Sequence, residues 1–215
     1  MQPWSLVVPA KLLSRAKTRL APLTARSGDD APARHRELVL AMLGDTVAAA
    51  LASPAVAGVL VVTDDPGVGD LVRALGARTT PDVPDRGLNA ALAHGAATAR
   101  AAGARAVAAM SSDLPALRAE ELTAALAAVV GGRGFVADAD GTGTTLLCAA
   151  TGELDPRFGP GSAAAHAAGG AVPLAGDWPG LRRDVDTAAD LDAAGGLGVG
   201  PRTARLLAAT PWSPG

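Results

Sequence analysis

Short apolar runs rich in β-branched residues alternate along this chain with longer stretches rich in alanine and leucine. The apolar runs predict strands at 6–8, 56–62, 77–80, 104–110, 134–137, 145–149 and 171–174. The longer stretches predict helices at 32–52, 67–75, 88–102 and 118–130, with weaker ones at 162–168 and 188–194. This alternation is typical of a parallel sheet with helices on both faces. We therefore expect one domain over residues 1–215, a three-layer α/β/α sandwich with a mostly parallel mixed sheet.

Polar side chains follow several of the predicted strands. In open α/β sheets a ligand lies over the carboxyl ends of the strands, so these positions are the first to inspect. The first strand is followed by the cations Lys11, Arg15, Lys17 and Arg19, the second by Thr63, Asp64 and Asp65, and the fourth by Ser111, Ser112 and Asp113. Near the end of the chain, the segment "RRDVDTAADL" adds Asp184 and Asp186.

Lys11 and Lys17 are the only lysines of the sequence, although arginine is used throughout the rest. An ammonium group is a compact point charge that reaches between phosphate oxygens, where a planar guanidinium needs more room. Pro9 and four cations within nine residues, without regular acidic partners, predict an extended loop that wraps phosphates. A solvated basic loop is the alternative interpretation.

Asp113 lies between a predicted buried strand and a predicted helix. Its carboxylate is therefore a candidate metal ligand and equally a candidate helix N-cap. Mg²⁺ is held by one or two protein carboxylates, while water and substrate phosphates complete its coordination. Asp113 with Asp184 or Asp186 would suffice, and the sequence does not choose between the last two. Asp186, which precedes Thr187, also has an N-cap as its alternative role.

The composition narrows the class of partner. The sequence is 49% hydrophobic and 19% charged, with a net charge of -2, so positive charge would act locally on a small anionic ligand and not on nucleic acid. No apolar run approaches the roughly 18 residues of a membrane span, and no secretion signal is evident, so we expect no membrane association. The single cysteine, Cys148, suits a reducing compartment, and we expect a cytoplasmic protein.

Other patterns point to different chemistry. Asp138 and Asp140 form an Asp-x-Asp pair, the arrangement with which glycosyltransferases hold a metal-bound sugar nucleotide. The segment "GLGVGP" at 196–201 lacks the spacing of a dinucleotide-binding loop and predicts a turn. A phosphate-loop motif does not occur. The three histidines, His35, His94 and His166, lie far apart without metal-ligand spacing, which favours surface or helix positions.

Seven segments, in order along nearly the whole chain, resemble the guanylyltransferases of coenzyme F420 biosynthesis: "VPAKLLSRAKTRL", "VVTDD", "DRGLNAAL", "SSDLPAL", "GTGTTLL", "FGPGSAAAH" and "RRDVDTAADL". The resemblance implies a nucleotide-diphospho-sugar transferase-like, Rossmann-like fold, shared with wider α/β nucleotidyltransferases. It also implies transfer of GMP from GTP to the phosphate of a three-carbon acid, with release of pyrophosphate. The acceptor is phosphoenolpyruvate in the actinobacterial branch and 2-phospho-L-lactate in the archaeal branch; the GC-rich composition favours the first.

The resemblance also implies roles for individual residues. The triphosphate-binding loop of the family matches Lys11, Lys17 and Arg19, and the segment that lines its nucleotide pocket matches Gly87, Leu88 and Asn89. Its main Mg²⁺ ligand matches Asp113, with Asp184 or Asp186 completing the metal site. The contacts to the acceptor's phosphate and carboxylate match Thr144, Gly159 and Ser162. One departure is Ser112, where relatives often have glycine.

Several alternatives stay open at this point. A molybdopterin guanylyltransferase or a cytidylyltransferase would share the fold and the metal site, with different base and acceptor pockets. A glycosyltransferase would place its metal on Asp138 and Asp140, and a nucleotide-sensing or scaffold domain would bind GTP without releasing pyrophosphate. The predicted helix at 32–52 has enough apolar positions for a homodimer interface, although a buried core face explains them equally well. An enzyme of this family would pass its product to the next enzyme of the pathway.

Overall fold

A computed structural model describes residues 3–10, 31–83 and 85–209. The described part holds a seven-stranded sheet with the order β3-β2-β1-β4-β6-β5-β7. The strands are β1 (Trp4–Pro9), β2 (Val56–Val62), β3 (Arg78–Thr80), β4 (Ala106–Met110), β5 (Arg133–Ala137), β6 (Thr144–Ala149) and β7 (Val172–Pro173). Strand β6 runs antiparallel to β4 and β5, while the other neighbouring pairs are parallel. The predicted mostly parallel mixed sheet is confirmed.

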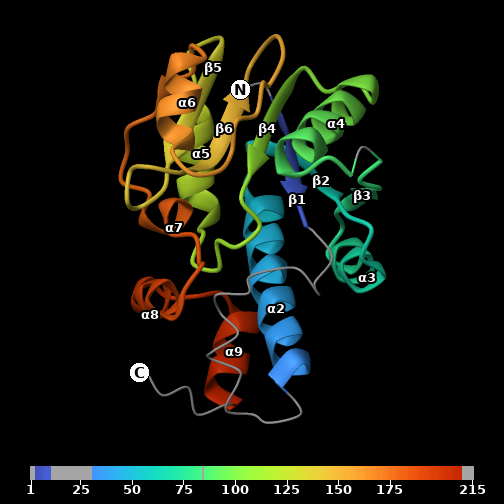
Figure 1. The fold of residues 1–215 in the computed structure, drawn as a ribbon, viewed down its shortest axis with the longest axis vertical. Helices are drawn as coiled ribbons and strands as arrows, with labels where there is room; N and C mark the ends of the chain where they lie inside the picture. The colour runs from blue at the N-terminus through green and yellow to red at the C-terminus, as the bar shows by residue number, and fades with distance from the viewer. Residues whose placement is uncertain (1–2, 11–30, 84, 210–215) are drawn as a thin grey trace.

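Helices cover both faces of the sheet (Figure 1). One face carries α2 (Ala31–Ala52), α3 (Pro66–Ala74), α5 (Ala119–Ala127) and the short α7 (Pro179–Arg182). The other face carries α4 (Leu88–Ala101) and α6 (Ser162–Ala168). Two further helices, α8 (Ala188–Leu197) and α9 (Pro201–Ala209), pack near the N-terminal half of α2. Within the described ranges, no helix is long and apolar enough to cross a membrane.

The central strands are apolar on both faces because both faces are covered. In β1, Leu6 and Val8 pack into the core under α2, while Val7 packs into the core under α4. These three side chains are fully buried, and burying each one stabilises the fold by about 1.5–3 kcal/mol. Helix α4 approaches the sheet closely through Gly95, where an added Cβ would lie 2.7 Å from Cγ2 of Val62.

Helix α2 buries its apolar positions within the domain. Leu43, Val47 and Ala50 belong to the core between α2 and the sheet. Leu38 and Met42 belong to a second apolar cluster, formed with residues of α8 and α9. Core burial therefore accounts for the apolar positions that also suited a homodimer interface, and a homodimer stays a prediction.

Asp45 of α2 holds the beginning of α9 across the interface between the two helices. Its carboxylate is buried and accepts hydrogen bonds from the backbone N–H groups of Arg202 (3.1 Å) and Thr203 (2.8 Å). These are N–H groups of the first helical turn, which have no partner within the helix itself. A side chain distant in sequence thus caps α9.

Replacing Asp45 by alanine is expected to lower the free energy of unfolding by about 1–2 kcal/mol, because two N–H groups at the start of α9 lose their acceptor. Urea denaturation followed by circular dichroism measures this change. Asp192→Ala removes an exposed carboxylate from α8 and serves as the control. Equal stability of the two variants would contradict the capping role of Asp45.

Candidate active site

A cavity of about 700 Å³ lies where β1 and β4 end. Because β6 runs antiparallel to β4, its first residue, Thr144, reaches the same end of the sheet. The lining is apolar toward α2, α3 and α4 and polar toward the loops that follow β4 and precede α6 and α8. The polar lining residues are Ser111, Ser112, Asp113, Asp138, Thr142, Thr144, Ser162, Asp184 and Asp186.

Asp113 is buried in a loop that is fixed from three sides. The hydroxyl of Thr46 on α2 accepts a hydrogen bond from the Leu114 N–H (2.9 Å), and the Asp113 carbonyl accepts one from Val185 N–H (3.1 Å). The Pro115 carbonyl accepts a third from Gly200 N–H (2.8 Å). The Asp113 carboxylate therefore occupies a preorganised position in the cavity lining.

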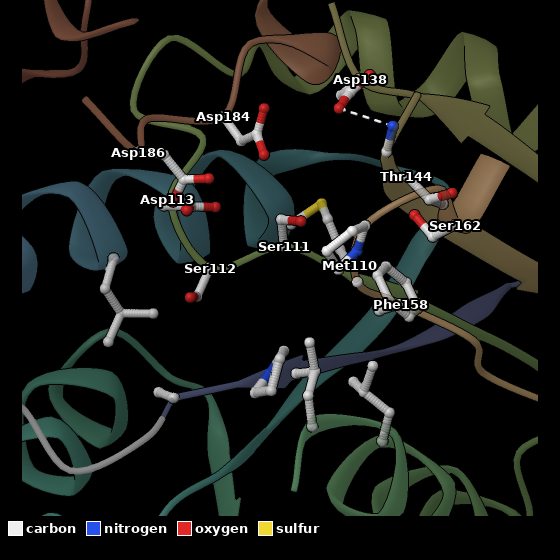
Figure 2. Close-up of a pocket in the computed structure, with 18 of the residues that line it drawn as sticks. Met110, Ser111, Ser112, Asp113, Asp138, Thr144, Phe158, Ser162, Asp184 and Asp186 are labelled. Atoms are coloured by element: carbon white, nitrogen blue, oxygen red, sulfur yellow. Dashed lines mark hydrogen bonds between the residues drawn. The ribbon is translucent and has the colours of Figure 1, made fainter. Parts of the chain in front are cut away.

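The hydrogen bond from Val185 also brings Asp184 and Asp186 to Asp113, because these two residues flank Val185 in sequence. All three aspartates line the cavity. Figure 2 shows their carboxylates at one end of the pocket, with Thr144 and Ser162 at the other end. The sequence-predicted metal ligands are thus brought together.

Neither Asp113 nor Asp186 is the N-cap of the helix that follows it. Helix α5 has Arg118 as its N-cap, and α8 has Thr187, whose hydroxyl accepts a hydrogen bond from Asp190 N–H. The Asp190 carboxylate in turn accepts hydrogen bonds from Asp186 N–H and Thr187 N–H. The N-cap alternatives for Asp113 and Asp186 are therefore wrong.

The carboxylates suit a hard divalent cation. Mg²⁺ prefers oxygen ligands and takes one or two carboxylates from a protein, so Asp113 with one neighbour provides a fitting donor set. Among the described residues no group of three or more His, Cys, Asp or Glu side chains is placed to hold a metal ion. The arrangement fits a metal that arrives with a phosphate ligand better than a permanently bound structural ion.

The charged side chains that line the cavity in the described part of the chain are all acidic. The lining includes four aspartates and, within the ranges that the structure describes, neither lysine, arginine nor histidine. The predicted phosphate-binding cations Lys11, Lys17 and Arg19 lie outside the described residues. Lys11 comes directly after Pro9 and Ala10, which do line the cavity, and Lys17 and Arg19 belong to the same segment of the sequence. Their contacts with phosphate stay a prediction.

The three residues predicted to contact the acceptor, Thr144, Gly159 and Ser162, all line the cavity. Gly159 and Gly161 have φ values of 130° and 71°, a region of backbone conformation that favours glycine. They allow the loop between Phe158 and α6 to turn along the cavity wall. The structure thus groups these residues as expected, and their contact with the acceptor stays a prediction.

Asn89, which is 69 positions from Phe158 in the sequence, holds this loop by direct hydrogen bonds. Its amide nitrogen donates to the carbonyl of Phe158 (3.0 Å), and its amide oxygen accepts from Phe158 N–H (2.7 Å). Of the predicted nucleotide-pocket segment, Leu88 lines the cavity, whereas Gly87 and Asn89 are not among its lining residues. A nucleotide contact by Gly87, Leu88 or Asn89 stays a prediction; the structure adds the pairing between Asn89 and Phe158.

Asp138 lines the cavity, but its carboxylate is used within the turn between β5 and β6. One oxygen accepts a hydrogen bond from Thr142 N–H (2.9 Å) and the other from Gly143 N–H (2.8 Å). The dashed line at Asp138 in Figure 2 marks a hydrogen bond of this carboxylate. Asp140 is exposed and is not among the cavity-lining residues. The turn role of Asp138 therefore argues against a metal held by the Asp-x-Asp pair.

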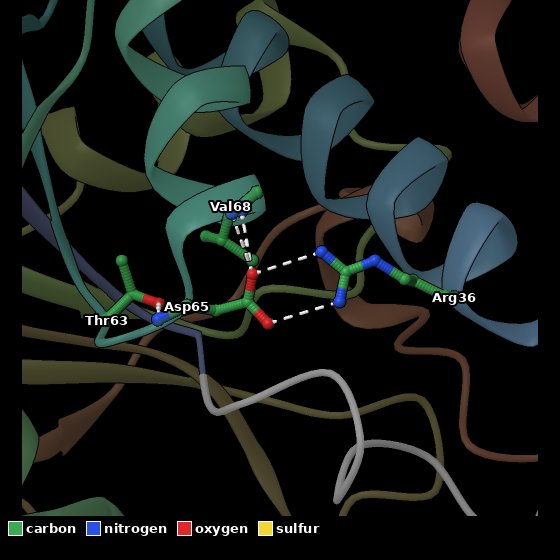
Figure 3. A network of polar contacts seen from close by, with 5 residues as sticks. Arg36, Thr63, Asp65 and Val68 are labelled. Carbon is green, nitrogen blue, oxygen red and sulfur yellow. Dashed lines mark hydrogen bonds and ion pairs between the residues drawn. The ribbon is translucent and has the colours of Figure 1, made fainter. Parts of the chain in front are cut away.

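The polar residues after β2 form a separate, structural network (Figure 3). Asp65 caps α3 by accepting hydrogen bonds from Gly67 N–H (2.9 Å) and Val68 N–H (3.2 Å). Its carboxylate also pairs with Arg36 of α2 at 3.3 Å. The network joins the beginnings of α2 and α3, beside the apolar part of the cavity to which Val68 contributes.

Sequence reasoning missed one residue of this region, His166. It lies in a helix, as expected, but the residue is only 2% exposed and its side chain contacts Thr144. No sequence motif indicates this contact, because Thr144 is 22 positions away. Ser112, where relatives often have glycine, does not have a positive φ: among the described non-glycine residues, only Asp85 and Asp155 do.

Comparison with solved structures defines the class of fold. The chain is similar to a protein from Desulfovibrio desulfuricans G20 described as a nucleotide-diphospho-sugar transferase, with a TM-score of 0.65, 18% identity and coverage of 90% of this chain and 86% of that one. It is also similar to a nucleotidyl transferase from Methanothermobacter thermautotroptrophicus, with a TM-score of 0.58, 21% identity and coverage of 91% and 97%. The fold is that of the α/β nucleotidyltransferases, as predicted.

Sequence comparison then gives the family. The model of the family described as "Guanylyl transferase CofC like" matches residues 4–169. A phosphoenolpyruvate guanylyltransferase from Geodermatophilus obscurus is 67% identical over 95% of this chain and 94% of its own length. One from Salinispora arenicola is 56% identical, again over 95% and 94%. The chain belongs to the CofC-like guanylyl transferase family, and it is a nucleotidyltransferase.

Proposed function

We propose that this protein transfers GMP from GTP to the phosphate of phosphoenolpyruvate in coenzyme F420 biosynthesis, releasing pyrophosphate. The observation that carries the proposal is the similarity over 95% of the chain, at 67% and 56% identity, to two phosphoenolpyruvate guanylyltransferases. The cavity supports it, since the carboxylates of Asp113, Asp184 and Asp186 at one end suit a metal-bound triphosphate, and the hydroxyls of Thr144 and Ser162 at the other suit an anionic acceptor. The product is enolpyruvyl-diphospho-5'-guanosine.

The reaction needs charge compensation more than acid–base catalysis. The second pKa of a phosphate monoester is about 6, so the acceptor is largely dianionic near neutral pH and attacks without a general base. Two unit charges about 4 Å apart repel each other by about 4 kcal/mol near a protein surface. Bringing a dianion to a triphosphate therefore requires cations at fixed positions and an in-line arrangement of the two phosphates.

Asp113 with Asp184 or Asp186 would hold Mg²⁺ beside the nucleotide. When bound, the ion supplies positive charge to the transferring phosphoryl group. Lys11, Lys17 and Arg19 neutralise the departing pyrophosphate. Thr144 and Ser162 donate hydrogen bonds to the acceptor, and the preorganised loop around Asp113 keeps the carboxylate in place during the reaction.

The test is incubation with GTP and Mg²⁺ and either phosphoenolpyruvate or 2-phospho-L-lactate, with pyrophosphate release as the readout. We expect a higher kcat/KM with phosphoenolpyruvate. CTP, ATP and UTP in place of GTP test the base. Pyrophosphate release only with another nucleotide, or only with a pterin phosphate as acceptor, would overturn the proposal.

Removal of divalent metal is expected to abolish pyrophosphate release, because Asp113 with Asp184 or Asp186 would then have no ion with which to hold and polarise the triphosphate. Dialysis against EDTA followed by addition of Mg²⁺ should remove and restore the activity. The unfolding midpoint should not change, since no group of three metal-ligating side chains exists in the described part of the chain. Full activity in excess EDTA would rule out the metal requirement.

A further inference from the structure

His166 connects the backbone of one loop to a hydroxyl in the cavity. Its ring is buried beside Phe135 and Phe158, with ring centroids 5.9 Å and 5.2 Å away. Nε2 accepts a hydrogen bond from the Arg157 N–H at 2.9 Å. Nδ1 lies 3.0 Å from Oγ1 of Thr144. Both ring nitrogens are therefore occupied.

The bond from Arg157 fixes which ring nitrogen carries the proton. A backbone N–H can only donate, so Nε2 must be the unprotonated nitrogen. Burial, assisted by the charge of Arg157, lowers the pKa of His166 to about 4, and the ring is neutral near pH 7. A neutral imidazole carries one proton, which is therefore on Nδ1. Nδ1 donates to Thr144, whose Oγ1 accepts.

The Thr144 hydroxyl is thereby left as a donor. Its oxygen accepts the bond from His166, so its own hydrogen must point to a different partner. Within the described residues the Thr144 hydroxyl makes no other hydrogen bond, and the residue lines the cavity. Figure 2 shows it on the same side of the pocket as Ser162. An oxyanion is the ligand that such a donor binds best.

We propose that His166 is a positioning residue that fixes the Thr144 hydroxyl as a hydrogen-bond donor to an oxyanion of the acceptor. This inference rests on the proposed function, because it assigns the acceptor to the end of the cavity with Thr144 and Ser162. A hydroxyl fixed before the substrate binds needs no reorientation when the anion arrives. The site then favours phosphate-bearing substrates that place an oxygen able to accept a hydrogen bond beside Thr144.

The bond from His166 to Thr144 is not needed to hold the neighbouring segments. Ala163 N–H donates to the Thr142 carbonyl at 3.1 Å, and Asn89 pairs with Phe158 through two hydrogen bonds. Asp155 pairs with Arg133 at 2.8 Å and with Arg157 at 3.0 Å. Hydrogen bonds from Arg133 and then Arg157 lower the pKa of Asp155. These contacts keep the Arg157 N–H in place independently of the bond to Thr144.

Two amide substitutions separate the functions of the two ring nitrogens. In His166→Gln the amide group takes the place of Nε2, which keeps an acceptor for Arg157 but loses the donor to Thr144. In His166→Asn the amide nitrogen takes the place of Nδ1, so the donor is kept and the acceptor is lost. We expect His166→Gln to raise KM for phosphoenolpyruvate about three- to tenfold, with KM for GTP nearly unchanged. His166→Asn should restore the KM for phosphoenolpyruvate toward that of the wild type.

A double-mutant cycle tests whether His166 acts through Thr144. Thr144→Val removes the hydroxyl, and His166→Gln should then have little additional effect on the KM for phosphoenolpyruvate. His94→Gln, a change on the half-buried face of α4, is the matched control. Additive effects of Thr144→Val and His166→Gln, or equal changes in KM for both substrates, would overturn the proposal.

Nitrogen-15 NMR of the three histidines gives a readout without turnover. We expect one imidazole with a protonated Nδ1 and a bare Nε2 down to acidic pH, absent from His166→Gln. Inorganic phosphate should shift this Nδ1 signal in the wild type but not in Thr144→Val. A proton on Nε2, or no response to phosphate, would refute the role of His166. Absence of pyrophosphate release by the wild type would refute the proposed function while leaving this measurement valid.

Discussion

Asp113→Asn is expected to lower kcat for pyrophosphate release by about 10²- to 10³-fold while leaving the fold intact. Asparagine has nearly the same volume as aspartate. The loop is held by hydrogen bonds of its backbone, to the Thr46 hydroxyl and the Val185 N–H, which do not use the Asp113 side chain. The substitution removes a negative oxygen ligand from the end of the cavity where Asp184 and Asp186 also lie. Steady-state kinetics and urea denaturation measure activity and stability separately.

Asp140→Asn is the matched control for Asp113→Asn. It removes an exposed carboxylate that is not among the cavity-lining residues, and nucleotidyl transfer should be unaffected. The reverse pattern, with Asp113→Asn active and Asp140→Asn inactive, would support a glycosyltransferase-type metal site instead. Asparagine at Asp184 and at Asp186, one at a time, then identifies the second metal ligand.

The sheet could be predicted because its signals are local. The strand predicted at 56–62 is observed with the same ends, and the helix predicted at 162–168 is α6. The turn predicted at "GLGVGP" is confirmed only at 198–200, where Gly198 has a positive φ; the segment's first two residues end α8 and Pro201 begins α9. A run of β-branched residues fits a pleated, buried surface, so the run itself marks a strand in the sequence.

Helices α7 and α9 were not predicted, because their stability comes from distant residues. Helix α7 has four residues, and Gly180 fits where an added Cβ would collide with the Ala116 carbonyl. Helix α9 receives its cap from Asp45, more than 150 positions earlier in the chain. A local sequence pattern contains no information about such contacts.

The candidate site was predictable in its location but not in its internal bonding. Strand ends indicated Asp113, and the resemblance indicated Thr144, Gly159 and Ser162, all of which line one cavity. The sequence did not show that Asp138 is used by its own turn. It also did not show that His166 contacts Thr144, because a hydrogen bond between side chains of two different elements leaves no periodic pattern.

Lys17→Ala is expected to lower kcat/KM for GTP by about 10²- to 10³-fold. The described lining of the cavity has four aspartates and no cationic side chain, so a triphosphate there needs positive charge from elsewhere. The segment after Pro9 and Ala10 begins at the cavity and carries both lysines of the chain. Loss of one ammonium leaves phosphate oxygens facing carboxylates, a repulsion of several kcal/mol at a protein surface.

Lys17→Arg separates charge from shape in this prediction. A guanidinium keeps the charge but needs a wider, planar site, so we expect activity between that of Lys17→Ala and the wild type. Arg105→Ala removes an exposed cation just before β4, at the opposite end of the sheet from the cavity, and should leave kcat/KM for GTP unchanged. Steady-state kinetics with varied GTP measures all three variants. Wild-type activity of Lys17→Ala would show that the early cationic segment does not bind the triphosphate, and the cavity's negative charge would then require a different source of compensation.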